Sequence, residues 1–147
     1  IEQFLAAYMK ADLRGAPRIV HAPGHSFCDM DVKCLHLVNL ATVAAIERHA
    51  GRAVDPLRFR ANVYLEGLPA CEEFRWVGQR IRLGEATLEV IARTERCAAT
   101  NVDPATGARD MGLPQLLMRS YGHSDVGIHA VVTRPGTIRP GDATGLL

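Results

Sequence analysis

The sequence has 147 residues, of which 48% are hydrophobic and 22% are charged. This length suits one globular domain, and the composition argues against intrinsic disorder and low-complexity architecture. No apolar run approaches the roughly 20 residues of a membrane span. The 17 Lys and Arg residues nearly balance the 16 Asp and Glu residues, giving a formal net charge of +1. Bulk electrostatics therefore offer no argument for nucleic-acid binding, and we expect neither a nucleic-acid nor a membrane partner.

Arginine dominates the basic residues. Lys10 and Lys33 are the only lysines among the 17 basic residues. Arginine keeps its charge when it is desolvated and presents a planar fork of donors, which suits phosphate and oxyanion recognition. A GC-rich coding sequence also favours arginine over lysine, so both explanations stay open. A pyridoxal Schiff base needs a lysine amine, and we therefore expect no covalent pyridoxal site within this chain.

The four cysteines, Cys28, Cys34, Cys71 and Cys97, are too few and too scattered for a disulfide framework. None lies in the C-x-x-C pair typical of zinc and redox sites. His25 stands near Cys28, but the spacing matches no zinc signature, and we interpret that segment as a polar loop. No basic start followed by an apolar stretch marks a secretory signal. A reducing compartment, and hence the cytoplasm, fits these observations best.

The first ten residues carry the pattern of an amphipathic helix. Apolar side chains recur there at i, i+3, i+4 and i+7, namely at Ile1, Phe4, Leu5 and Tyr8. Because this helix is already under way at the first residue, we expect the sequence to be a fragment of a longer protein. We interpret residues 1–33 as an N-terminal helix and loop left from an upstream region, and residues 34–147 as the main domain.

A second helix is predicted after Asn39. Asn39 can cap the helix, residues 40–46 provide its apolar face, and Gly51 can end it in the left-handed conformation.

The period of the pattern changes to two after Pro56. Apolar and polar residues alternate over residues 58–65, which predicts a strand with one apolar face. Its polar face would present Arg58, Arg60 and Asn62. Such a face needs either water or an anionic partner, and the sequence leaves both interpretations open.

Short segments separated by glycines follow. Residues 80–83 and 86–92 indicate a hairpin, and residues 97–102 indicate another strand before a turn at 103–107. The final elements expected are a short helix near Pro114 to Ser120 and a strand from Val126 to Thr133. The pattern predicts a β-rich α+β fold, with a twisted sheet or barrel flanked by helices.

Cys97 is the residue with the clearest chemical potential. Arg93 and Arg96 place positive charge near its thiol, which favours the thiolate that binds soft metals or attacks electrophiles. A lone cysteine at the start of a strand is also often an inert small hydrophobic residue.

Several strings of this sequence, in their order and spacing, resemble the MOSC domain, the C-terminal domain of molybdenum cofactor sulfurase. The resemblance covers roughly Cys34 to Asp142, and one position departs from many relatives, since Ala61 stands where they have proline. The matching strings are Arg58-Phe59-Arg60-Ala61-Asn62, Trp76-Val77-Gly78, Arg96-Cys97-x-x-Thr100-x-Val102-Asp103-Pro104-x-Thr106-Gly107, Gly127-Ile128-His129-Ala130-Val131 and Gly136-Thr137-Ile138-Arg139-Pro140-Gly141-Asp142.

The resemblance implies a MOSC-type, β-barrel-like domain over residues 34–147, which can lack strands that lie upstream. It also implies that Cys97 is the catalytic residue and the ligand of the molybdenum in a pterin cofactor. Arg60 and Asn62, with Arg96 beside the cysteine, would anchor that cofactor. In relatives such as the amidoxime-reducing component, the implied activity is reduction of N-hydroxylated small molecules, with electrons delivered by a separate redox protein.

The sulfurase branch of the family implies a different role. There, pyridoxal phosphate is bound by another domain of the longer chain, and Cys97 would carry sulfur as a persulfide for a partner protein. A third interpretation is a degenerate domain in which Cys97 is buried and inert.

Overall fold

The computed structural model describes residues 1–11, 13–21, 23–24 and 30–147. Within these residues the helices are α1 (Glu2–Tyr8), α2 (Leu40–Ala50) and α3 (Leu113–Tyr121), and the 3-10 helices are η1 (Pro56–Phe59), η2 (Glu72–Trp76) and η3 (Ala98–Asn101). The strands are β1 (Leu35–Asn39), β2 (Val63–Leu65), β3 (Arg80–Leu83), β4 (Ala86–Glu95), β5 (Asp125–Arg134) and β6 (Thr144–Leu146).

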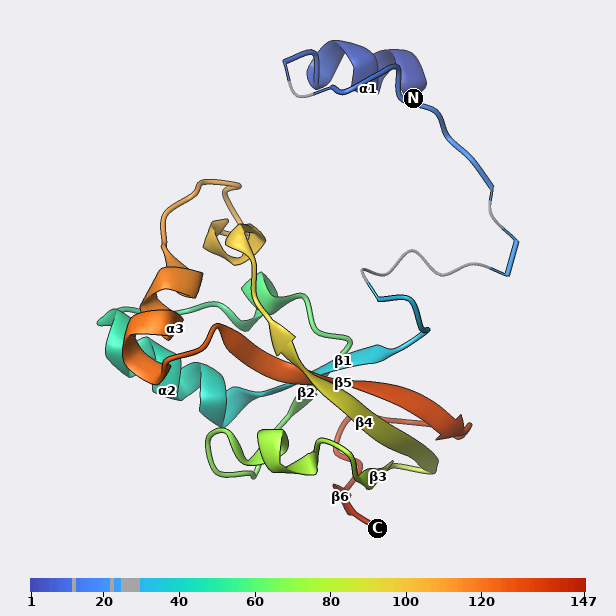
Figure 1. Cartoon of the computed structure of the whole chain (residues 1–147), viewed down its shortest axis with the longest axis vertical. Helices are drawn as coiled ribbons and strands as arrows, with labels where there is room; N and C mark the ends of the chain where they lie inside the picture. The colour runs from blue at the N-terminus through green and yellow to red at the C-terminus, as the bar shows by residue number, and fades with distance from the viewer. Residues whose placement is uncertain (12, 22, 25–29) are drawn as a thin grey trace.

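The strands form one curled, mixed sheet in the order β2-β1-β5-β4-β3-β6 (Figure 1). Strands β1 and β2 run parallel, and the other neighbouring pairs run antiparallel. The long strands β4 and β5 cross the middle of the sheet, with irregular register that helps the sheet to bend. The prediction of a β-rich α+β fold, with a twisted sheet flanked by helices, is confirmed.

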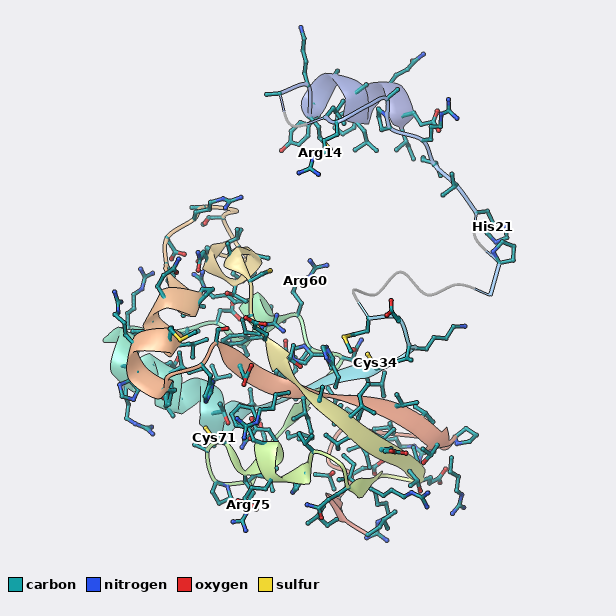
Figure 2. All side chains as sticks on the ribbon, in the orientation of Figure 1. Arg14, His21, Cys34, Arg60, Cys71 and Arg75 are labelled. Carbon is teal, nitrogen blue, oxygen red and sulfur yellow. The ribbon has the colours of Figure 1, made fainter. Side chains whose placement is uncertain are left out.

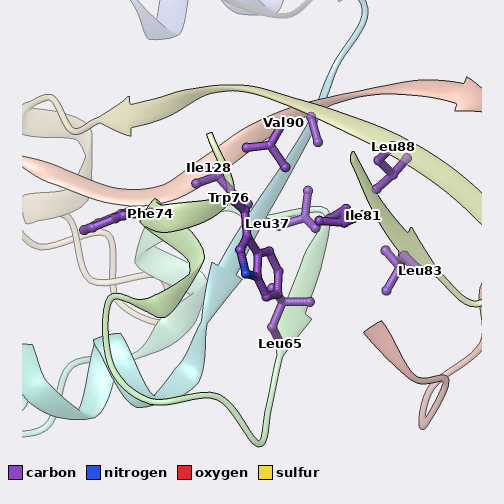
Figure 3. Packing of buried hydrophobic residues seen from close by; sticks show 10 residues of the cluster. Leu37, Leu65, Phe74, Trp76, Ile81, Leu83, Leu88, Val90 and Ile128 are labelled. Atoms are coloured by element: carbon purple, nitrogen blue, oxygen red, sulfur yellow. The ribbon is translucent and has the colours of Figure 1, made fainter. Parts of the chain in front are cut away.

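The two faces of this sheet bury two separate cores. One core lies inside the curl, where the indole of Trp76 from η2 packs among strand residues (Figure 3). The other lies between the sheet and the pair α2 and α3, and it includes Phe59 from η1. Neighbouring residues of β1 serve opposite cores, since Leu37 belongs to the first and Val38 to the second. Strand β1 is therefore buried on both faces.

Helix α2 and the β3–β4 hairpin agree with the prediction. The Asn39 side chain accepts a hydrogen bond of 3.0 Å from the Ala41 N–H, and Gly51 ends the helix with φ 65°. The hairpin turns at Gly84, and Ile81 and Leu83 alternate inward with the exposed Arg80 and Arg82 of β3. Helix α3 and strand β5 also form close to the expected positions.

The predicted strand over residues 58–65 is wrong for residues 58–62. The Asp55 side chain accepts a hydrogen bond of 2.8 Å from the Leu57 N–H and caps the 3-10 helix η1, which Pro56 begins. Arg60 then adopts the left-handed conformation, with φ 51°, so only the last three residues of the segment form β2. Local capping thus overrides the period-two pattern, and the predicted polar face does not exist.

The predicted strand over residues 97–102 is also wrong. The backbone N–H and the hydroxyl of Thr100 both donate to the Cys97 carbonyl, at 3.2 and 2.9 Å, and the chain forms η3. These local hydrogen bonds compete with strand pairing. The turn that follows does form, because the Asp103 carboxylate accepts from the N–H groups of Ala105 and Thr106.

The N-terminal region leaves several predictions open. Helix α1 forms as expected, but it buries no residue, and Figure 1 shows it away from the sheet. The division into residues 1–33 and 34–147 remains a prediction. His25 and Cys28 of the expected polar loop lie outside the described residues. No helix in the described part of the chain combines the length and apolar character that crossing a bilayer requires.

Candidate functional site

Arg58 points into the protein. Its side chain is only 2% exposed, and its Nη2 lies 2.8 Å from Asp110 and 3.2 Å from Asp103. Its Nη1 donates to the Asn101 carbonyl at 3.3 Å. Arg58 therefore joins η1 to the loop that follows η3, and both of its carboxylate partners compensate its charge. It shares no exposed face with Arg60.

Arg60 and Asn62 lie on the loop between η1 and β2. The left-handed backbone at Arg60 turns its guanidinium outward, and Figure 2 shows the side chain extending away from the sheet. Asn62 is exposed but fixed, because its Oδ1 accepts a hydrogen bond of 2.8 Å from the His36 N–H. Its own backbone N–H donates to the His36 carbonyl at 2.8 Å. Among the described residues, none accepts a hydrogen bond from the Asn62 side-chain amide.

Arg96 follows the end of β4 and reaches the same loop. Its Nη2 donates to the Phe59 carbonyl at 2.9 Å, and its guanidinium carbon lies 5.8 Å from the centre of the Phe59 ring. Its Nη1 lies 3.5 Å from Nε2 of His36. The arginine beside the cysteine is thus tied to the residue immediately before Arg60.

Cys97 is exposed and directly follows Arg96. Its carbonyl accepts both hydrogen bonds from Thr100, which is 1% exposed. The other end of η3 is held by Asn101, whose side-chain oxygen accepts from the Leu113 N–H at 2.8 Å. Exposure of Cys97 contradicts the interpretation in which this cysteine is buried.

Arg93 does not join this group. It lies on β4, with its guanidinium 4.7 Å from the centre of the Phe74 ring and 3.8 Å from Asp125. The expectation that two arginines flank the thiol therefore holds only for Arg96, which is the direct neighbour of Cys97.

His36 is the residue that the sequence analysis missed. Its ring is 8% exposed, and Nε2 lies 3.2 Å from the Val126 carbonyl. Burial, and then the positive charge of Arg96, lower the pKa of His36 from 6.5 to about 4. Backbone hydrogen bonds with Val126 and, more weakly, with Arg60 act on this pKa in the opposite direction. His36 thus contacts the backbone or side chain of all three predicted anchors, Arg60, Asn62 and Arg96.

A cleft of about 550 Å³ lies elsewhere, between α2, α3 and the loop before α3. Its lining includes His49, Asn101, Asp110 and Arg119, and it contains none of the predicted site residues. The described residues form no group of three or more His, Cys, Asp or Glu side chains that could hold a metal ion. Among the residues that the structure describes, the predicted site therefore offers the exposed Cys97 thiol as its protein ligand for a metal.

The curled six-stranded sheet, with α2 and α3 covering one face, defines a β-rich domain of the barrel-like class. The family model of the MOSC domain matches residues 24–144, and the chain belongs to this family. It is 27% identical to mitochondrial amidoxime-reducing component 1 of Homo sapiens over 123 residues, which are 76% of this chain and 36% of that protein. It is 31% identical to molybdenum cofactor sulfurase of Caenorhabditis briggsae over 107 residues, which are 71% of this chain and 15% of that protein.

Solved structures support the same fold. YiiM from Geobacillus stearothermophilus superposes with a TM-score of 0.60 and 22% identity, over 77% of this chain and 53% of that chain. YiiM from Escherichia coli gives 0.56 and 24%, with the same coverage. The chain thus spans about half the length of these structures and about a third of the amidoxime-reducing components.

Proposed function

We propose that this MOSC domain binds a molybdenum–pterin cofactor, with Cys97 as the molybdenum ligand and catalytic residue. Arg60, Asn62 and Arg96 would hold the rest of the cofactor. One observation carries the proposal: the exposed Cys97 follows Arg96, whose guanidinium donates to the carbonyl of Phe59, the residue directly before Arg60.

The chemistry of these donors fits such a group. An exposed thiolate suits a soft metal, and an exposed guanidinium at Arg60 suits a phosphate. The Asn62 amide is held by its oxygen, so its N–H groups face outward and can meet the acceptor edge of a pterin. When bound, the cofactor would supply two-electron chemistry, while the protein contributes ligation, orientation and positive charge.

The reaction proposed is reduction of an N-hydroxylated small molecule. Breaking the N–O bond in this way consumes two electrons and two protons and releases water. The electrons would come from a separate redox protein, since no other redox group is part of the proposal. The names of the amidoxime-reducing relatives favour this reaction. A cytoplasmic location is part of the same proposal.

Metal analysis tests the proposal. The whole protein is purified from a host that makes the cofactor, beside Cys97→Ala and the control Cys71→Ala. Cys71 packs against the core inside the curl. We expect molybdenum in the unchanged protein and in the control, and its loss in Cys97→Ala. Equal molybdenum in all three proteins, or none in any, would contradict the proposal.

The second candidate is a sulfur carrier, in which Cys97 holds a persulfide for a partner protein. It is favoured by the exposure of the thiol and by the similarity to molybdenum cofactor sulfurase. Mass spectrometry after incubation with a sulfur donor distinguishes the two. A persulfide on Cys97 in a protein without molybdenum would support the carrier, and an unmodified Cys97 would exclude it.

A further inference from the structure

The residues proposed to hold the cofactor come from separate parts of the chain. Arg60 and Asn62 lie on a loop with little regular structure, and Arg96 lies where β4 has ended. A flexible loop and a long side chain lose conformational entropy when they bind a ligand, which weakens binding unless something fixes them beforehand. A residue that fixes them in advance therefore contributes to binding without touching the ligand.

His36 is placed to do this. It lies on β1, which is buried on both faces between β2 and β5, so its position is set by the sheet. Its backbone N–H and carbonyl form the two hydrogen bonds with Asn62, each of 2.8 Å. Its ring faces the Val126 carbonyl, the Arg60 backbone and the guanidinium of Arg96.

The ring contacts constrain the protonation of His36. Arg96 can only donate a hydrogen bond, so at 3.5 Å it requires an unprotonated Nε2. The Val126 carbonyl, 3.2 Å from the same nitrogen, requires a proton there. One nitrogen cannot satisfy both: the neutral ring accepts from Arg96 only with its proton on Nδ1, and with its proton on Nε2 it donates to the Val126 carbonyl instead.

We propose that His36 is a positioning residue that fixes the Arg96 guanidinium and the Arg60–Asn62 loop in the geometry that receives the cofactor. The expected effect of His36 on cofactor binding rests on the proposed function. The structural part of the inference, the restraint of Arg96 by the His36 ring, does not require a bound cofactor.

Two substitutions of similar size separate the hydrogen bond from simple packing. His36→Gln keeps an acceptor that can meet Arg96, whereas His36→Leu fills the space without one. His49→Gln serves as the control, because it removes an exposed imidazole on α2 that contacts none of the three anchors. Urea unfolding confirms that each variant folds before the comparison is made.

The decisive readout is the reactivity of the Arg96 side chain with phenylglyoxal, followed by mass spectrometry in protein without cofactor. Arg93, which is 47% exposed, is the internal reference. We expect Arg96 to react about tenfold faster in His36→Leu, the effect of one lost hydrogen bond to a charged group, and near the original rate in His36→Gln and His49→Gln. An unchanged rate in His36→Leu would overturn the inference.

Molybdenum content then tests the link to the cofactor. We expect His36→Leu and Arg96→Ala to lower it, and the double variant to lower it no more than the worse single change, because both act through one guanidinium. Full molybdenum in a His36→Leu protein with a reactive Arg96 would overturn the positioning role. If the unchanged protein binds no molybdenum, the proposed function fails, whereas the phenylglyoxal result still decides whether His36 restrains Arg96.

Discussion

The two ends of strand β1 carry buried polar clusters of opposite charge. At the start, His36 lies beside Arg96 under a loop whose Arg60 and Asn62 are exposed. At the end, Asn39 donates to the Glu73 carboxylate at 3.0 Å.

The second cluster is closed. Thr42 also donates to Glu73, at 2.8 Å, and its hydroxyl accepts from the Cys71 N–H. Glu73 and Asn39 have no exposed surface. Every polar group named there finds its partner inside the protein, so this cluster joins η2 to the β1–α2 junction. The first cluster leaves donors facing outward, and it is therefore the one suited to a ligand.

The largest loss of stability is expected at Gly127, where β5 runs antiparallel beside β1 and lies next to His36. Gly127 has φ 81°, and a Cβ atom there would meet the Leu37 carbonyl oxygen, with His36 Nε2 at 2.7 Å and Val38 Cγ2 at 2.8 Å. Gly127→Ala should therefore lower the free energy of unfolding by about 4 kcal/mol, from left-handed strain and overpacking together. Urea unfolding measures this value.

Gly78 provides the control for this prediction. It has a similar φ of 80°, but a Cβ atom there would meet nothing within 4 Å. Gly78→Ala should cost only the conformational part, roughly 1 kcal/mol. Equal losses for the two substitutions would show that the close approach of the strands at His36 is not what requires Gly127.

The fold was predictable where local chemistry decides it. Asn39 and Gly51 bound α2 as their residue types indicate, and Gly84 turns the hairpin. Strand β1 was missed because its assignment depends on β5, whose residues lie about 90 positions later. The same distance explains why His36 was missed, since nothing in its neighbouring residues indicates the Val126 carbonyl or Arg96.

Breaking the closed cluster gives the next largest effect. Glu73→Ala removes the acceptor of two buried donors, on Asn39 and Thr42, and leaves a cavity. We expect a loss of roughly 3 kcal/mol in the free energy of unfolding, measured in urea. Its neighbour Glu72 pairs with Arg75 at 3.8 Å on the surface, and Glu72→Ala should cost under about 1 kcal/mol. Similar costs for the two would show that the cluster does not stabilise this end of β1.

The opposite charges of the clusters predict opposite responses to pH. Because the folded state lowers the pKa of His36 from 6.5 to about 4, the unfolded chain binds the extra proton in that window, and stability falls as the pH falls. The full loss from His36 is roughly 3 kcal/mol. Besides Arg96, the titratable group facing this ring is His129 of β5, which lowers the pKa of His36 further.

Glu73 acts in the other direction. Burial raises its pKa above the ordinary 4.5, so stability from this group is greatest below 4.5 and falls as the pH rises through the raised value. Urea unfolding between pH 4 and 7 should therefore give a flatter pH dependence for His36→Gln and a steeper one for Glu73→Gln than for the unchanged protein. If both substitutions made the pH dependence of the free energy of unfolding flatter, or both made it steeper, the comparison would be contradicted.

The candidate site was predictable only as a set of residue types. The string around Cys97 indicated Arg96 and the cysteine; the cysteine is exposed, whereas Arg96 is half-buried against Phe59. The pattern also placed Arg58 with Arg60 and Asn62 on one face. Arg58 is instead buried against two carboxylates, because the cap on η1 turns its side chain inward. A sequence motif can therefore indicate which residue types take part in a site. It does not indicate where each side chain points, because that direction depends on the local backbone.

The smallest effect concerns two thiols: Cys71, whose N–H belongs to the closed cluster, and Cys97, which directly follows Arg96. Cys97 is exposed, whereas burial and the nearby Glu73 carboxylate raise the pKa of the Cys71 thiol. Since the thiolate is the reactive form, iodoacetamide should modify Cys97 at least about tenfold faster than Cys71 in folded protein without cofactor, as followed by peptide mass spectrometry. The two rates should converge in urea. Glu73→Gln should speed the reaction of Cys71 and leave that of Cys97 unchanged, because only Cys71 lies near this carboxylate. Equal rates in the folded protein would remove the distinction between a closed end of β1 and an open one.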